Sequence, residues 1–271
     1  MKAMLSSAVI MIALTGSTLA CPLLSDKTVL QGGLLIGRAP AGSKVSLKGK
    51  AVRVSNGGHF LIGFGRDADP KTKLVALKRN GESIECTVNV TKRKYKLERI
   101  DGLLERQVKP RAEDIKRIMA DNAAIARVRQ LDTTGTDFTA KFEWPVNGRI
   151  SGVFGSQRIL NGRPKRPHNG VDIAAPEGTP VQAPASGLVV LVHPDMFYTG
   201  KTVMLDHGHG LTSVYVHMSI ITVEVGQRVK SGDEIGRVGK TGRATGPHLH
   251  WGVSLFSTHL DPGLLVGRVH N

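Results

Sequence analysis

Short apolar runs separated by tight-turn residues limit the folds that the first third of this chain can adopt. Turn pairs such as Asn56 with Gly57 and Asp69 with Pro70 recur at regular spacing, and glycine makes up 32 of the 271 residues. Runs of this length, broken in this way, are typical of strands rather than helices. We therefore predict a mainly β chain in which residues 21–90 form a small β-sandwich-like domain. The runs are Thr28–Ile36, Lys44–Lys48, Ala51–Val54, His59–Phe64, Lys73–Leu77 and Ser83–Val90.

The first twenty residues are typical of a cleaved secretory signal. Lys2 gives a positive start, an apolar run follows over residues 3–14, and Thr18 and Ala20 are small residues at −3 and −1 of a cleavage site. We expect residues 1–20 to be a signal peptide and the chain to be exported, to a periplasm or the cell envelope. No later apolar run is long enough to span a bilayer, so no transmembrane segment is expected after signal removal.

The chain has two cysteines, Cys21 and Cys86. In an exported protein, the simplest interpretation of two cysteines is a disulfide between them. The alternative is a lipid anchor on Cys21, which would leave Cys86 unpaired. The disulfide is preferred because Thr18 stands where a lipoprotein signal has leucine.

Residues 91–143 change character and are predicted to be a basic strand and helical connector. A basic run over 91–96 precedes Pro110, after which apolar residues at helical spacing predict a helix over 111–131. We expect the apolar stripe of this helix to dock on a domain. The stripe consists of Ile115, Ile118, Met119, Ile125 and Val128.

The formal net charge of +15 favours an anionic environment, such as nucleic acid, a membrane surface or acidic cell-wall polymer. Aromatic residues make up 4% of the chain, too few for the stacking platform of single-strand binders. Acidic residues dilute the charge of the predicted helix. We therefore expect no nucleic-acid partner.

Seven of the ten histidines fall between residues 168 and 250, in a region that again alternates strands and turns. His168 and Asp172 are four residues apart in extended chain, and His217 ends an alternating run. His248 and His250 would share one face of a strand, with the residue between them on the other face. Convergent imidazoles and a carboxylate suit a metal site or an acid–base site. Spacing alone does not say which of His248 and His250 binds metal.

Together these motifs resemble the lysostaphin-like family of zinc metallopeptidases, which cleave peptide bonds in bacterial peptidoglycan. The resemblance extends from about Gly152 to Val253 and includes the segments 178–183, 215–217 and 246–250. It implies that residues 144–271 form an antiparallel β catalytic domain of lysostaphin-like type. It also implies one Zn²⁺ per chain as cofactor.

The resemblance assigns His168, Asp172 and His250 as zinc ligands, and His217 and His248 as catalytic residues off the metal. Two imidazoles and a carboxylate leave a fourth position on zinc open. The chain has no His-Glu-x-x-His motif, so a histidine must handle the proton. Either His217 or His248 can do so, and their separate roles stay open.

Members of this family often carry a tyrosine upstream of the first ligand, and none lies between residues 144 and 168 here. Tyr215, on the same predicted strand face as Ser213 and His217, or Arg158 could take its place beside the developing oxyanion. Of the remaining histidines, His59 is interpreted as structural, and His207 and His209 as structural or solvent-exposed. His193, His259 and His270 are interpreted as surface residues.

The predicted function is that of a zinc metalloendopeptidase hydrolysing peptide bonds in peptidoglycan stem peptides or cross-bridges, with peptidoglycan as partner. The alternative is a non-catalytic murein-binding or amidase-activating scaffold of the same fold, against which the five matching site residues argue. The N-terminal region could position substrate or cover the zinc site. The bond cleaved, the oligomeric state and any protein partner stay open.

Overall fold

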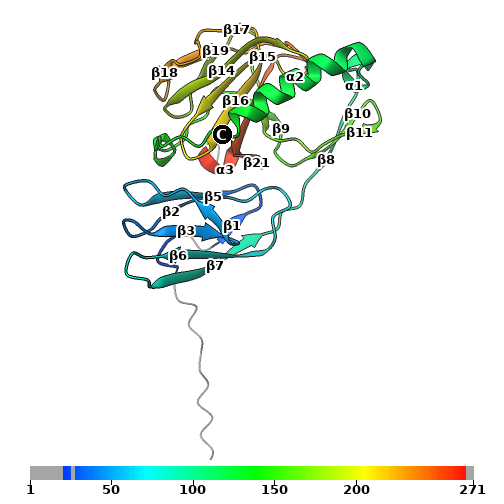
Figure 1. Cartoon of the computed structure of the whole chain (residues 1–271). Coiled ribbons are helices and arrows are strands. Elements are labelled where there is room, and N and C mark those ends of the chain that lie inside the picture. The colour runs from blue at the N-terminus through cyan, green and yellow to red at the C-terminus, as the bar shows by residue number, and fades with distance from the viewer. Residues whose placement is uncertain (1–20, 26–27, 267–271) are drawn as a thin grey trace, which may run out of the picture.

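The structure of the protein is a computed structural model that describes residues 21–25 and 28–266. The expected signal peptide and His270 lie outside the described residues. Figure 1 shows two β-rich parts stacked on one another, with the long helix α2 lying along the C-terminal part. The predicted mainly β architecture is confirmed. No helix among the described residues is both long enough and apolar enough to cross a bilayer.

The C-terminal part is built on an eight-stranded antiparallel sheet in the order β18-β14-β15-β16-β20-β12-β9, with β21 beside β20. A smaller sheet, β13-β19-β17, packs with it around Ile173, Leu205 and Trp251, which are fully buried. The short helix α3 (Gly263–Val266) closes the chain. The strands are β9 (Arg149–Gly152), β12 (Val171–Ala174), β13 (Pro180–Gln182), β14 (Gly187–Met196), β15 (Gly200–Asp206), β16 (Leu211–Met218), β17 (Ile220–Ile221), β18 (Arg228–Val229), β19 (Glu234–Arg237), β20 (His248–Leu255) and β21 (Thr258–Leu260).

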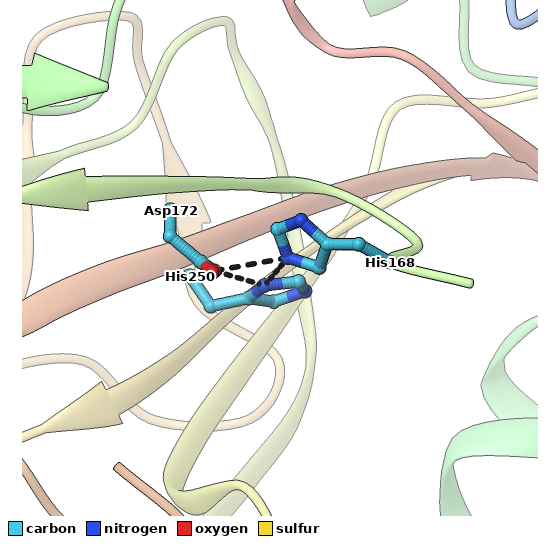
Figure 2. Close-up of side chains that lie close together, drawn as sticks. All are labelled: His168, Asp172 and His250. Atoms are coloured by element: carbon cyan, nitrogen blue, oxygen red, sulfur yellow. Dashed lines mark hydrogen bonds and ion pairs between the residues drawn. The ribbon is translucent and has the colours of Figure 1, made fainter. Parts of the chain in front are cut away.

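The register of three neighbouring strands brings the predicted site together. Asp172 on β12 lies directly opposite His250 on β20, and Val216 on β16 lies opposite His250 from the other side. Directly opposed residues of an antiparallel pair point to the same face of the sheet. Figure 2 shows Asp172 and His250 meeting in this way, with His168 reaching them from the loop before β12.

The segment predicted as a connector contributes to the C-terminal part. Its strand β8 (Leu97–Ile100) pairs in parallel with β10 (Gln157–Leu160), and β11 (Arg163–Pro164) completes this three-stranded sheet. Two helices follow, α1 (Glu105–Val108) and α2 (Ala112–Val128), and then a single 3₁₀ turn, η1 (Asp137–Thr139).

Helix α2 agrees with the predicted helix over 111–131, but its apolar stripe is only partly covered. Val128 packs against Met204 and Val216 of the large sheet. Ile115 and Met119 are 45% and 66% exposed. The expected docking of one helix face is therefore confirmed for the C-terminal half of α2, whereas Ile115 and Met119 at the other end of the stripe are left largely exposed.

The N-terminal part contains two sheets that share one core. The larger has the order β1-β7-β6-β3-β4, and the smaller pairs β2 with β5. Phe60 from the small sheet packs with Leu74 and Val88 from the large one, and all three are fully buried. The strands are β1 (Thr28–Leu30), β2 (Leu34–Arg38), β3 (Lys44–Leu47), β4 (Lys50–Val52), β5 (His59–Gly63), β6 (Lys71–Leu77) and β7 (Ser83–Thr91).

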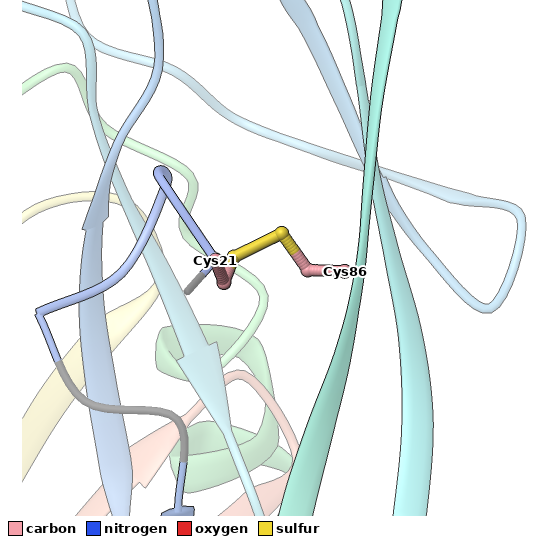
Figure 3. The surroundings of a disulfide bond; sticks show 2 residues. All are labelled: Cys21 and Cys86. Atoms are coloured by element: carbon pink, nitrogen blue, oxygen red, sulfur yellow. A yellow bond between two sulfur atoms is a disulfide. The ribbon is translucent and has the colours of Figure 1, made fainter. Parts of the chain in front are cut away.

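A disulfide joins Cys21, at the start of the described chain, to Cys86 on β7 (Figure 3). The predicted pairing is thus confirmed. It fastens the first described residues to the central region of the N-terminal core, where both cysteines are buried.

Candidate metal centre and catalytic site

Three side chains converge on one face of the sheet, beside the paired strands β12 and β20 (Figure 2). His168 Nε2 lies 3.0 Å from Asp172 Oδ1, and His250 Nδ1 lies 2.7 Å from the same oxygen. The two ring nitrogens are 2.8 Å apart. The three residues form a group able to hold a metal ion.

The donor set fits a small divalent cation. Tetrahedral zinc with bonds of 2.0–2.1 Å keeps its ligand atoms about 3.3 Å apart, so the observed triangle needs to widen by only a few tenths of an ångström. The Nδ1–H of His168 donates to the Val153 carbonyl at 3.1 Å, which leaves its Nε2 lone pair directed at the other two ligands. A backbone partner of this kind fixes the tautomer that metal binding requires.

The protonation states also suit metal binding. Burial alone would raise the pKa of Asp172, but the imidazole rings of His168 and His250 beside its Oδ1 outweigh this effect and hold that pKa well below its usual range. Burial lowers the pKa of His250 to about 4, against the opposing effect of Asp172. At neutral pH the carboxylate is therefore ionised and the His250 imidazole is neutral.

Two glycines allow the ligands to approach this closely. A Cβ on Gly170 would lie 2.4 Å from the Trp251 carbonyl oxygen and 2.8 Å from Cε1 of His250. A Cβ on Gly152 would lie 2.4 Å from Oδ2 of Asp172. Both positions therefore require glycine for steric reasons that become visible only once the strands are paired.

Arg158 on β10 holds the far oxygen of the proposed carboxylate ligand. Its guanidinium pairs with Oδ2 of Asp172 and lies 3.6 Å from the Glu98 carboxylate on β8. Asp172 therefore presents Oδ1 to the histidines while Arg158 fixes Oδ2. The sequence suggested Arg158 as oxyanion support; its observed contact is with the carboxylate.

His217 and His248 form a second pair beside the first. Their ring centroids are 4.8 Å apart, and the His217 ring lies 6.4 Å from that of His250. The Nδ1 of His217 donates to the Thr241 carbonyl, and the Nδ1 of His248 donates to the Gly246 carbonyl, both at 2.8 Å. Each ring is thereby left with an unprotonated Nε2, the atom that can accept a proton.

Burial, and then the neighbouring His248 and His250, lowers the pKa of His217 to about 3. His217 also has a φ of 66°, which is uncommon for a residue other than glycine and is found at functional sites. The pairing register of β15 and β16 shifts at this end of the strand. This local break turns His217 towards His248 instead of continuing the alternation of β16.

The prediction that Tyr215 shares a strand face with His217 is therefore wrong. Tyr215 is fully buried in the main core with Trp251, on the opposite face of the sheet from Val216 and His250. Its hydroxyl lies 2.8 Å from Ser213 Oγ, and burial raises its pKa. Tyr215 cannot reach an oxyanion at the proposed metal site.

The histidines of the β15–β16 turn are structural, as predicted, but neither is solvent-exposed. His207 is fully buried, with Nδ1 2.7 Å from the Ser186 carbonyl and Nε2 2.8 Å from Ser213 Oγ. His209 is 3% exposed and packs on Phe138. Outside this turn, His193 accepts a hydrogen bond from the Asp195 amide, and His259, predicted at the surface, is partly buried in a cavity wall.

Two cavities meet at this centre. One, of about 330 Å³, contains Asp172, His217 and His248, and the other, of about 520 Å³, contains His168 and His250. Connector residues line both of them, and sequence reasoning, which only raised the possibility that the N-terminal region covers the site, did not identify them because local patterns carry no signal for such contacts. These residues are Ile100 and Leu103 in the first cavity and Asn122, Ile125 and Arg129 in the second.

The fold and the site together define a β-sheet protein with a metallopeptidase-type centre. Comparison with known proteins then identifies the family. Residues 166–262 match peptidase family M23. A crystal structure from Pseudomonas aeruginosa, of a protein assigned to peptidase M23, aligns with a TM-score of 0.68 and 32% identity, over 91% of this chain and 98% of that one. The chain belongs to peptidase family M23.

Two curated relatives each match somewhat less than half of the chain. Peptidoglycan DD-endopeptidase ShyA of Vibrio cholerae serotype O1 is 43% identical over 127 residues, which are 44% of this chain and 29% of ShyA. DD-carboxypeptidase/endopeptidase Mpg of Neisseria meningitidis serogroup B is 40% identical over 117 residues, which are 43% of this chain and 27% of Mpg. The chain thus spans less than a third of the length of these relatives.

Proposed function

We propose that the chain is a zinc-dependent endopeptidase that hydrolyses peptide bonds in peptidoglycan stem peptides or cross-bridges. The observation that carries the proposal is the convergence of His168, Asp172 and His250 beside a second pair of imidazoles, His217 and His248. Two histidines and one carboxylate are a ligand set typical of catalytic zinc. The name of ShyA, a peptidoglycan DD-endopeptidase, supports peptidoglycan as the substrate class.

The residues around the proposed metal have distinct tasks. A zinc ion bound there would supply Lewis acidity to the scissile carbonyl and to an attacking water. His217 and His248 each offer an unprotonated Nε2 to the same cavity, so one can accept the proton of the water and deliver it to the leaving amine. Arg158 holds Asp172 in the orientation that keeps Oδ1 directed at the histidines.

Incubation of the purified protein with peptidoglycan tests the proposal. Fragments released with added zinc, and again with a chelator, are identified by mass spectrometry. We expect metal-dependent release of peptide fragments, whose masses also identify the bond that is cleaved. A non-catalytic scaffold would bind the polymer and release nothing under either condition.

Two single substitutions separate the proposed roles of neighbouring residues. His250→Ala should lose zinc, whereas His248→Ala should keep zinc and lose roughly 10²–10⁴-fold in turnover. His193→Ala, on β14 outside both cavities, is the matched control. Metal content and hydrolysis rate are measured on all three variants, and equal zinc loss in the first two would contradict the assignment.

We further infer that the protein acts in the cell envelope, with a Gram-negative periplasm as the preferred compartment. The signal-like start of the sequence, the disulfide and the peptidoglycan-directed relatives support this location. Fractionation of cells that express the full chain tests it. The mass of the recovered protein distinguishes a chain that simply begins at Cys21 from one that is lipid-modified there.

A further inference from the structure

The larger of the two cavities adjoins the proposed metal site on the side of helix α2. Both proposed imidazole ligands, His168 and His250, lie in its wall, while the carboxylate ligand Asp172 lies in the wall of the other cavity. The two cavities share Arg158 and Arg243. A peptide bound across the metal would therefore place one side of its scissile bond in each cavity.

The lining of the larger cavity is strongly cationic. Among the described residues that line it there is neither an aspartate nor a glutamate. The basic residues in its wall are Arg129, Arg158, Lys165, Arg166 and Arg243.

Most of this positive charge has no carboxylate partner. Arg158 is paired with Asp172, as described above. The ammonium group of Lys165 donates to the Val108 carbonyl, which is neutral. Within the described chain, no ion pair involves Lys165, Arg166, Arg129 or Arg243.

Arg243 is held in place by neutral groups. Its guanidinium donates to the Gln107 carbonyl at 3.3 Å and lies 4.4 Å from the centroid of the Tyr198 ring. Burial lowers its pKa. These contacts orient the guanidinium and leave its charge uncompensated.

Arg129, which directly follows α2, is the least satisfied of these side chains. Its Nε is buried and has no hydrogen-bond partner among the described residues. Burial first, and then Arg129, His250 and Arg166, lowers the pKa of His259 to about 4, so the arginines lie close enough to His259 to affect it. A partly buried guanidinium without an anion is unfavourable unless a bound group supplies the missing charge.

We propose that this cavity is a carboxylate-binding subsite, in which the uncompensated positive charge of its wall, to which Arg129 and Arg243 contribute, attracts a carboxylate of the peptide substrate beside the scissile bond. The proposal rests on the proposed function and narrows its substrate class to peptides that carry a free carboxylate on this side. Guanidinium groups match carboxylates through paired, charge-assisted hydrogen bonds. The carboxylate can belong to an acidic side chain or to the C-terminus of a stem peptide.

The test compares cross-linked stem peptides with two derivatives, one amidated at the C-terminus and one amidated at the acidic side chains. The zinc-loaded full chain is assayed alongside Arg129→Gln, Arg243→Gln and the control Arg127→Gln. Arg127 is an exposed residue at the same end of α2, outside the cavity. The control therefore removes the same charge without touching the subsite.

We expect one of the two amidations to raise KM for the wild-type protein by about ten-fold or more, which identifies the source of the carboxylate. Arg129→Gln and Arg243→Gln should raise KM for the acid substrate by a similar factor and no longer distinguish acid from amide. Arg127→Gln should keep the wild-type preference. Equal KM values for acid and amides in the wild type, or an undiminished preference in both cavity variants, would overturn the proposal.

Failure of the proposed function is recognisable separately. If the zinc-loaded chain cleaves none of these peptides, the endopeptidase assignment fails. The affinity of the chain for the uncleaved acid peptide, measured by calorimetry, then tests the subsite independently of cleavage. That peptide should bind the wild type and Arg127→Gln at least ten-fold more tightly than Arg129→Gln. Equal affinity in all three would refute the subsite.

Discussion

Replacing Gly170 by alanine tests whether the metal site depends on the close approach of the His168 loop to β20. The new Cβ would lie 2.4 Å from the Trp251 carbonyl oxygen and 2.8 Å from Cε1 of His250, and real Cβ atoms essentially never lie within 3.0 Å of a non-bonded heavy atom of a residue elsewhere in the chain. The loop and β20 must therefore separate by about 0.6 Å, which a close-packed interior transmits to the ligands. The side chains that would move apart are His168 and His250.

The expected cost follows from the size of that separation. Zinc requires the ligand nitrogens of His168 and His250, which lie 2.8 Å apart here, at a defined spacing and bond direction, and a shift of the backbone that carries them changes both. Disturbing the groups that orient metal ligands costs roughly 10–100-fold in metal affinity, or about 1.4–2.7 kcal/mol. We expect Gly170→Ala to weaken zinc binding by this factor and to regain part of its activity when zinc is added in excess.

A competition titration against a chromophoric chelator measures the zinc affinity, and hydrolysis is followed as a function of zinc concentration. Gly65→Ala is the control, because a Cβ there makes an ordinary 3.5 Å contact with Thr258, far from the centre. If Gly170→Ala bound zinc as tightly as the wild type and retained full activity, the steric reasoning would be refuted.

Three further predictions concern the fold that supports the site. Tyr215→Phe removes a buried hydrogen bond and should lower the free energy of unfolding by about 1 kcal/mol while leaving turnover unchanged; a large loss of turnover in a hydrolysis assay would contradict the placement of Tyr215. Replacing Cys21 and Cys86 by alanine should cost about 4 kcal/mol in denaturant unfolding, because the bond closes a segment of 65 residues; an unchanged midpoint would oppose this estimate. Burial lowers the pKa of His207 in the folded chain, so this imidazole binds a proton more readily when the chain is unfolded. The stability that neutral, buried His207 contributes is therefore present above pH 6.5. It is lost as the pH falls below 6.5, by up to about 1.4 kcal/mol per pH unit. Urea midpoints measured between pH 7.5 and 5 should fall less steeply in His207→Gln, and parallel curves would argue against the assignment.

Sequence patterns were sufficient to predict those features of the fold that depend on residues close together in the chain. The hairpin of β15 and β16 and the burial of Leu249 between the two histidines of β20 both follow from strand alternation and turn chemistry. The pairing of β8 with β10 does not, because it joins segments far apart in the chain and no local period reports it. Helical spacing likewise showed which residues share a face of α2, but not which of them the rest of the chain covers, so the exposure of Met119 was missed.

At the site, the five predicted residues do come together. Two features of the site depend only on residues close together in the chain and could therefore be predicted. They are the spacing of His248 and His250 and the segment from His168 to Asp172. The orientation of His217 was not predictable, because a single residue with a φ of 66° ends the alternation that the sequence suggests. The separate roles of these residues remain predictions until metal content and turnover are measured.

Because β8 pairs with β10, the chain can become active only late in its synthesis and folding. β8 leaves the ribosome about sixty residues ahead of its partner, and the proposed ligand His250 is made later still. The N-terminal sheets can form early, as N-terminal units generally do, while β8 waits as an unpaired strand. We therefore expect the cavity walls and the metal centre to be completed together, near the end of folding. A partly synthesised chain could then not hydrolyse the polymer on which the protein is proposed to act.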